Sequence, residues 1–162
     1  SGHSFGGQTT QAISGQTFGA LSQSATESRI KAAIVMSPTL PLRGDTKAAF
    51  AEAKVPWLLM TGTLDGGVVG NQTPETRRGV FPLLPDGNKF ELVIHKAEHS
   101  AFTERALPGE KEPRNPNHHR VILATSTAFW DAYLRDDPAA KEWLTGKGVR
   151  SVLETADVWQ QK

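Results

Sequence analysis

The residues Gly2-His3-Ser4-Phe5-Gly6 could carry out nucleophilic chemistry. They fit the pattern G-x-S-x-G, in which a serine stands on a tight turn between a strand and a helix and exposes its hydroxyl at the carboxyl edge of a sheet. We expect both glycines to be required, because such a strained turn leaves no room for side chains two positions away from the serine. A glycine-rich tail that fits the pattern by chance is the alternative interpretation.

A serine nucleophile requires a base that takes its proton and an acid that orients the base. Behind a G-x-S-x-G turn these partners follow later in the chain, the acid before the histidine. Asp65 and His99 come in that order, each just after an apolar run. An Asp-Gly turn is the alternative for Asp65, and a loop histidine bonded to backbone is the alternative for His99. Glu98 is a poorer acid than Asp65, because side chains of adjacent residues diverge.

Three apolar runs predict the strands that must position these groups, near residues 32–37, 55–61 and 89–95. The first two are continuously apolar, which is typical of strands buried on both faces. The third alternates between apolar and polar residues, and we expect an outer strand with one wetter face. Because the carboxyl ends of parallel strands meet at one edge of a sheet, Ser4, Asp65 and His99 should meet there.

Helix-like segments lie between and after the strands. We expect helices over residues 6–14, 45–54 with Asp45 as its cap, 74–81, 117–134, and from the Asp137-Pro138 cap to Gly146. No segment repeats and no stretch is typical of a linker. The alternation predicts an α/β layered fold with a parallel sheet, formed by residues 1–162 as one domain.

Composition excludes several classes of protein. The chain has 162 residues with 18 Lys and Arg against 17 Asp and Glu, a net charge of +1 that gives little attraction to nucleic acid or an anionic membrane. It contains no apolar run long enough to span a bilayer, and its 38% hydrophobic content is ordinary for a folded domain. The absence of cysteine excludes disulfides, thiolate zinc sites and a cysteine nucleophile.

The other histidines and the tryptophans have less specific interpretations. His118 and His119, with Glu112 and Asp131 nearby in the sequence, suggest a metal site, but adjacent helical residues point about 100° apart and are poor co-ligands. We expect both histidines to be exposed at a helix start. We expect His3 to pack or bond beneath the serine and His95 to meet neighbours within its strand. We expect the four tryptophans to pack in the core or at an interface, although one of them could line an acyl pocket.

These motifs together resemble the carboxyl-terminal part of an α/β-hydrolase. The resemblance is carried by Gly-His-Ser-Phe-Gly-Gly, by Trp-Leu-Leu-Met-Thr-Gly-Thr-Leu-Asp and by Ala-Glu-His-Ser-Ala-Phe, and it covers nearly the whole chain. In detail it is similar to the branch of dienelactone-hydrolase-like and platelet-activating-factor-acetylhydrolase-like serine esterases, which includes relatives of polyester hydrolases. True dienelactone hydrolases use a cysteine, so Ser4 favours a general esterase.

The resemblance implies hydrolysis of small-molecule carboxylic esters through an acyl-enzyme, without metal or organic cofactor. It assigns Ser4 as nucleophile, His99 as base and then acid, and Asp65 as the orienting acid. The backbone N–H of Phe5 would be one donor of the oxyanion hole. No large insertion separates the first two strands, which favours an accessible site over a lid-covered one.

The family's fold has further strands before the serine, and the second oxyanion donor comes from a loop among them. Loss of one such donor costs about 2.7–4 kcal/mol, so we expect weak turnover from this chain alone. The expected neighbour of strand 32–37 is reduced to residues 1–3, and an open apolar edge is usually covered. We therefore expect a truncated hydrolase that forms a homo-oligomer or associates with a missing amino-terminal portion.

Two rival functions stay open at this point. A peptidase uses the same acyl-transfer chemistry. From a different class, the chain could be a non-catalytic fragment or interaction module that associates through its open sheet edge.

Overall fold

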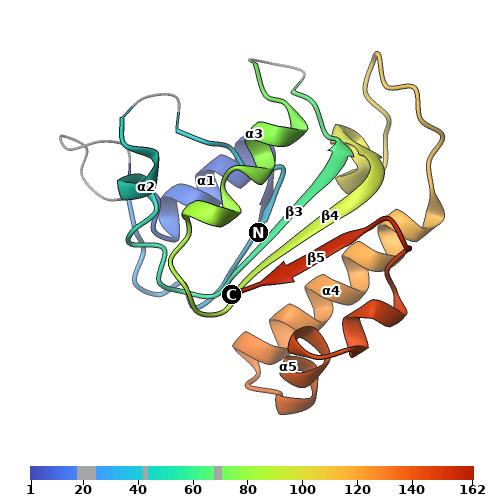
Figure 1. Cartoon of the computed structure of the whole chain (residues 1–162). Helices are drawn as coiled ribbons and strands as arrows, with labels where there is room; N and C mark the ends of the chain where they lie inside the picture. Colours follow the sequence, from blue (N-terminus) through green and yellow to red (C-terminus); the bar gives the residue numbers. More distant parts are fainter. Residues whose placement is uncertain (18–24, 42–43, 68–70) are drawn as a thin grey trace.

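The computed structural model describes residues 1–17, 25–41, 44–67 and 71–162 (Figure 1). Its centre is a five-stranded sheet in the order β1-β2-β3-β4-β5. The strands are β1 (Gly2–His3), β2 (Ala33–Met36), β3 (Trp57–Leu64), β4 (Lys89–Glu98) and β5 (Val158–Gln161). Strands β1 to β4 are parallel to their neighbours, and β5 is antiparallel to β4. The predicted α/β class with a mostly parallel sheet is confirmed.

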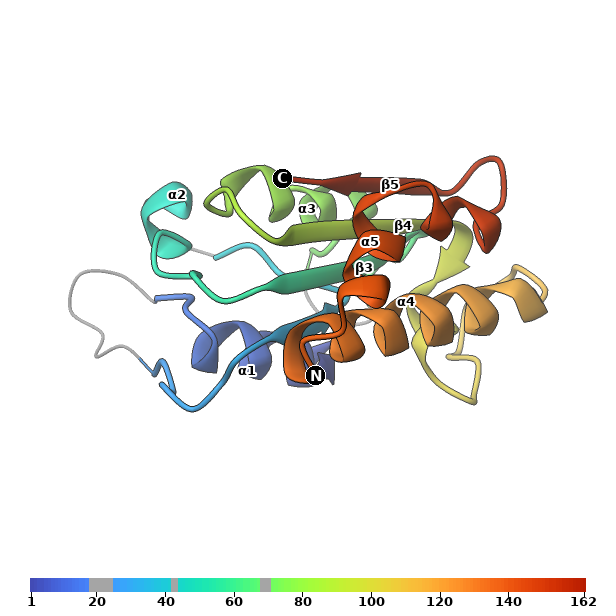
Figure 2. The same ribbon diagram turned by 90° about the horizontal axis from the view of Figure 1, so that it is seen from below.

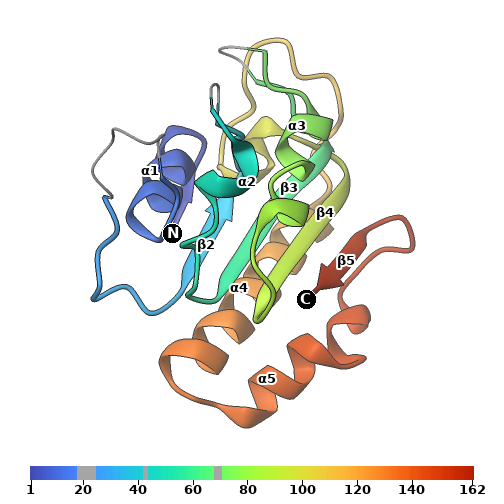
Figure 3. The same ribbon diagram turned by 60° about the vertical axis from the view of Figure 1, so that its left-hand side comes forward.

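Helices cover both faces of this sheet. They are α1 (Phe5–Ile13), α2 (Thr46–Ala49), α3 (Pro74–Arg78), α4 (Pro116–Leu134) and α5 (Pro138–Thr145), with 3-10 turns η1 (Phe81–Leu83), η2 (His99–Phe102) and η3 (Gly148–Ser151). Helices α1 to α3 lie on one side of the sheet and α4 and α5 on the other (Figures 2 and 3). Within the described ranges, no helix is long and apolar enough to cross a membrane.

The predicted strands are present, but the third one has a different position in the sheet. Strand β4 is not an outer strand, because β5 pairs with it, with Leu92 opposite Trp159. Both faces of its first six residues are buried. The sequence did not predict β5, since its four residues, Val-Trp-Gln-Gln, are too few and too polar to stand out. The expected pairing of residues 1–3 with the first strand is confirmed by the register of Gly2 with Val35.

The predicted helices at 45–54 and 74–81 are shorter in the structure. Asp45 caps α2 as expected, with its Oδ1 accepting from the N–H groups of Lys47 and Ala48 at 2.9 and 3.1 Å. The helix ends after one turn, where the chain places the side chains of Phe50 and Ala53 in the core instead. Helix α3 stops before η1, because Pro82 cannot donate the hydrogen bond that would continue it. The helices near 6–14, 117–134 and 137–146 form within a residue or two of their predicted bounds.

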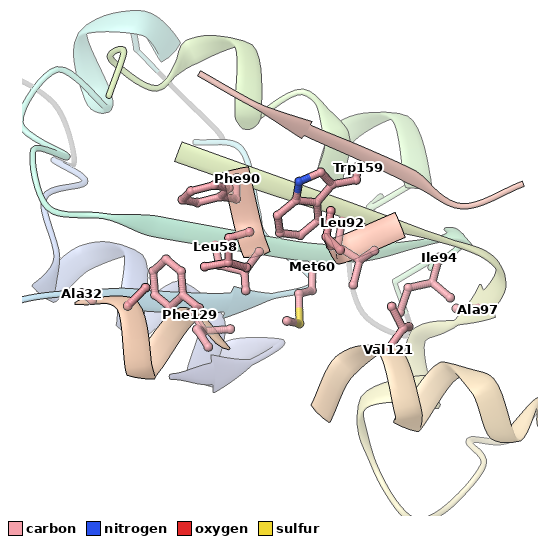
Figure 4. Close-up of a cluster of buried hydrophobic side chains, with 14 residues drawn as sticks. Ala32, Leu58, Met60, Phe90, Leu92, Ile94, Ala97, Val121, Phe129 and Trp159 are labelled. Carbon is pink, nitrogen blue, oxygen red and sulfur yellow. The ribbon is translucent and has the colours of Figure 1, made fainter. Parts of the chain in front are cut away.

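Alternate residues of the strands form two apolar clusters, one on each face. The larger cluster joins β2, β3 and β4 to α4, α5 and β5, as Figure 4 shows for Leu58, Phe90 and Phe129. The ring of Phe90 meets that of Phe129 edge-on at 6.1 Å and lies 5.6 Å from that of Trp159. Packing on both faces makes the sheet a rigid support for the loops at its carboxyl edge.

We predict that Phe129→Ala lowers the free energy of unfolding by about 3–5 kcal/mol, because it removes a fully buried ring from this cluster. Leu123→Ala is the matched control on the same helix, since Leu123 is 68% exposed, and it should change the value by less than about 0.5 kcal/mol. Denaturant titration measures both. Equal losses in the two variants would contradict the assignment of this cluster as the core.

Candidate active site

Three chain segments bring Ser4, Asp65 and His99 to one edge of the sheet. Ser4 stands between β1 and α1, Asp65 directly follows β3, and His99 directly follows β4. The carboxyl ends of β3 and β4 point the same way in Figure 1. This is the meeting of strand ends that the sequence predicted.

The three side chains form a continuous hydrogen-bonded chain. His99 Nδ1 lies 2.6 Å from Asp65 Oδ1, and His99 Nε2 lies 3.0 Å from Ser4 Oγ. Because an ionised carboxylate only accepts, Nδ1 carries the proton and donates it to Asp65, which leaves Nε2 to accept from the Ser4 hydroxyl. His99 can therefore take a proton from Ser4 while Asp65 holds the ring in place.

The Asp65 carboxylate is completely buried and is saturated with partners. Its Oδ2 accepts from Ser37 Oγ at 2.7 Å and from Thr61 Oγ1 at 2.8 Å, and its Oδ1 lies 2.9 Å from Arg77 Nε. Burial acts to raise the pKa of Asp65, but the hydrogen bond from His99, the charge of Arg77 and the two hydroxyls outweigh it and hold the pKa below its ordinary value. Asp65 is therefore an anion that can orient a histidine.

Arg77 ties this carboxylate to two strand ends. Its Nε also donates to the Asp65 carbonyl at 2.8 Å, and its Nη1 donates to the carbonyls of Ser37 at 2.9 Å and Pro38 at 3.3 Å. Burial lowers the pKa of Arg77, and Asp65 acts in the opposite direction. An arginine so close to a carboxylate stays charged.

Sequence reasoning missed Arg77, Ser37 and Thr61. Ser37 ends the first predicted strand and Thr61 ends the second, so both were expected near the carboxyl edge of the sheet. Nothing in the sequence marks either residue as a partner of Asp65. Arg77 lies on the predicted helical segment 74–81, among other charged residues. Only the folded contacts distinguish it from its exposed neighbour Arg78.

Ser4 adopts the strained backbone expected for its turn. Its φ of 57° and ψ of −118° lie in a region that residues other than glycine rarely visit. Its N–H donates to the Met36 carbonyl at 3.1 Å, which fixes the turn against β2. Phe5 is the first residue of α1, so its N–H has no acceptor within the helix and can serve a developing oxyanion. The Phe5 side chain itself is 72% exposed.

The glycines around Ser4 differ in what they permit. A Cβ on Gly2 would lie 2.1 Å from the Gly6 carbonyl oxygen, so Gly2 is required. A Cβ on Gly6 would meet nothing within 4 Å, so the prediction that Gly6 is required is wrong. The second close approach is at Gly7, whose Cβ would lie 2.8 Å from the Met36 carbonyl oxygen. Gly6 therefore has open space where a side chain would begin, whereas Gly7 lies close against the end of β2.

The sequence led us to expect His3 beneath the serine, and the structure shows its ring packed against that of His99. Its ring centroid lies 4.6 Å from that of His99 and 5.5 Å from that of Phe102. Burial, followed by the proximity of His99, lowers the pKa of His3. Its Nε2 is buried without a hydrogen-bond partner among the described residues. The neutral ring of His3 therefore serves to pack against the ring of His99.

The other charged and histidine candidates have structural partners. The prediction that His118 is exposed is wrong: it is buried, and its Nε2 donates to the His95 carbonyl at 3.0 Å, which joins α4 to β4. The Glu98 carboxylate turns away from His99 and accepts from the N–H groups of Lys111 and Glu112 at 2.9 and 3.3 Å. In the part of the chain that the structure describes, no three His, Asp or Glu side chains gather as a metal site would require.

Glu110 holds the turn that presents His99, and sequence reasoning missed it as well. Its carboxylate accepts from the N–H groups of Ser100 and Leu107 at 2.8 Å each, and from the Ser100 hydroxyl. A cavity of about 370 Å³ opens between this loop and the segment after β3, lined by Leu64, Gly66, Leu107 and Pro108 beside His99. A substrate group can lie there in reach of the base.

A comparison of the chain with protein-family models finds no match. A comparison with curated proteins finds no significant match either.

The two glycines give a matched pair of variants. We predict that Gly2→Ala costs about 1–3 kcal/mol of unfolding free energy, because the added methyl group overlaps the Gly6 carbonyl. Gly6→Ala should be neutral or stabilising by up to about 1 kcal/mol, because alanine replaces glycine in a helix with open space around it. Denaturant titration of both proteins provides the test. A loss in Gly6→Ala as large as that in Gly2→Ala would refute the geometry described for this turn.

Proposed function

We propose that this protein is a serine hydrolase that cleaves carboxylic esters through an acyl-enzyme. The observation that carries the proposal is the unbroken chain of hydrogen bonds from Ser4 Oγ through His99 to Asp65. Two further features support it. The strained backbone at Ser4 and the burial of the charged Asp65 both cost folding free energy, and packing of the core requires neither of them.

In the proposed reaction, Ser4 Oγ attacks the ester carbonyl as its proton passes to His99 Nε2. The carbonyl oxygen becomes an oxyanion beside the N–H of Phe5. When the tetrahedral intermediate collapses, the bond to the alcohol breaks and His99 gives its proton to the leaving oxygen. Water then attacks the acyl-enzyme with His99 again as base, and the acid leaves as Ser4 recovers its proton. Every step uses groups of this chain, substrate and water.

The order of the strands supports an α/β-hydrolase type of fold for this reaction. The nucleophile follows β1, the acid follows β3 and the histidine follows β4, all within the parallel part of the sheet. This agrees with the resemblance of the three motifs to serine esterases of the dienelactone-hydrolase-like branch.

The surroundings of His99 favour small to medium acyl esters. The cavity beside it is lined by Leu64, Leu107 and Pro108, by three glycines and by the charged residues Glu98 and Glu110, and Leu64 is 44% exposed. The nucleophile itself is only half-buried. An ester carbonyl can therefore approach Ser4, and Leu64 and Leu107 offer apolar contacts in the cavity beside His99.

The outer strand of the sheet favours a second candidate function, an interaction module. Strand β1 pairs only with β2 among the described strands, so its other edge is open to a second copy or to another segment. Size-exclusion chromatography beside an esterase assay separates the two candidates. An oligomer without turnover, unchanged by Ser4→Ala, would favour the module.

We predict that a fluorophosphonate probe labels Ser4 covalently, and peptide mapping by mass spectrometry checks the site. Labelling should be lost in Ser4→Ala and fall at least about 1000-fold in rate in His99→Ala, because the base is removed. Ser126→Ala on α4 is the matched control and should label like the wild type. A folded wild-type protein in which Ser4 stays unmodified would falsify the proposal.

Turnover of substrates separates an esterase from a peptidase. We expect hydrolysis of p-nitrophenyl esters with short acyl groups and little hydrolysis of peptide anilides, because the cavity of about 370 Å³ beside His99 has room for a small acyl group. Faster cleavage of the anilides would identify the peptidase instead.

A further inference from the structure

Arg77 stands out among the charged side chains near the site, because nothing in the proposed reaction uses it. It is 2% exposed, and all of its partners belong to the ends of β2 and β3 or to His99. A buried ion pair is weak evidence for stability, since apolar residues of similar size often serve as well. The position of this cation therefore points to another role.

Arg77 and His99 share one carboxylate oxygen. Asp65 Oδ1 lies 2.6 Å from His99 Nδ1 and 2.9 Å from Arg77 Nε. Arg77 Nη2 lies 3.3 Å from His99 Nδ1. Both of these nitrogens carry hydrogens while Nδ1 donates to Asp65, so the approach is not a hydrogen bond. It places a fixed positive charge against the ring that must accept a proton.

We propose that Arg77 is a positioning residue that sets the charge balance of the Asp65–His99 pair, an inference that rests on the proposed function. It orients the carboxylate for His99 and offsets part of its negative charge. Without Arg77, a buried carboxylate would have imidazolium as its only cationic partner and would hold His99 in the protonated, inactive form to higher pH. With Arg77 in place, the Asp65 carboxylate has a second cationic partner besides the ring of His99.

The other titratable groups that face His99 do not replace this effect. His3 packs on the ring from β1, but burial lowers its pKa and keeps it neutral. Glu110, on the loop after η2, is negative and acts on His99 in the same direction as Asp65, with its oxygens bonded to Ser100 and Leu107. Arg114 is bonded to the carbonyl and the hydroxyl of the neighbouring Ser100 at 3.3 Å each. Arg77 is the cation whose contact with the His99 ring itself the structure shows.

The test is the rate of fluorophosphonate labelling of Ser4 between about pH 5 and pH 10, in the wild type and in Arg77→Met. We expect the midpoint of the rise in rate to move up by about 1 pH unit or more in Arg77→Met, with much of the rate recovered at high pH. Arg78→Met is the matched control, since it removes an exposed arginine from the same helix, and Arg77→Lys keeps the charge. Both should keep the wild-type midpoint.

A uniform loss of rate in folded Arg77→Met, with the midpoint unchanged, would overturn the proposal and leave Arg77 a structural role only. If wild-type Ser4 is not labelled at any pH, the proposed function fails, and the ring nitrogens of His99 followed by NMR still test Arg77. Their titration midpoint should rise in Arg77→Met, and an unchanged midpoint overturns the inference.

One measurement needs no variant and covers the case in which Arg77→Met does not fold. The Arg77 Nε–H resonance of the wild type should shift with the same midpoint as the His99 ring nitrogens, because both groups bond to Asp65 Oδ1. An Nε–H resonance that does not respond to the titration of His99 would also overturn the proposal.

Discussion

The buried Asp65 carboxylate is the constraint on which the arrangement of this site depends. A charge removed from water is tolerated only when cations and hydrogen-bond donors replace the lost hydration. Here each partner comes from a different part of the fold: Ser37 from the end of β2, Thr61 from β3, Arg77 from α3 and His99 from the end of β4. The hydrogen bonds and ion pairs of this one carboxylate thus fix how four elements come together at the carboxyl edge of the sheet.

The sheet supplies the rigidity that this edge needs. Apolar clusters on both faces hold β2, β3 and β4 in register, so the residues that follow these strands have little freedom. The strain at Ser4 is supported in the same way. Its N–H is bonded to the end of β2, and the close approaches at Gly2 and Gly7 let α1 start directly against the strands. The position of the hydroxyl is therefore a consequence of backbone packing and depends little on its own side-chain contacts.

The features predicted from the sequence are those with a local signal. Continuous apolar runs predicted β2 and β3, and the G-x-S-x-G pattern with Asp65 and His99 in order predicted which side chains would meet. The partners of Asp65 had no such signal, because Arg77 differs from Arg78 only in which side of a short helix faces the sheet. The same limit explains the burial of His118 and the addition of β5, which depend on distant contacts with β4. Gly6 shows the reverse: a residue that fits a sequence pattern need not be required by the geometry.

The charges of the site explain why a buried acid, base and cation can work together in the proposed reaction. The charges of Asp65 and Arg77 offset each other before the proposed reaction, which requires a neutral His99 as its base. When the proton moves from Ser4 to His99, a positive imidazolium and a negative oxyanion appear together, so the net charge of the site does not change. The step separates charge over a short distance and adds no net charge beside the buried carboxylate, which keeps its electrostatic cost low. Without the cation, the resting site would carry a net negative charge that imidazolium alone could neutralise. In the proposed reaction, the charge of Arg77 therefore acts on the transfer of the proton from Ser4 to His99.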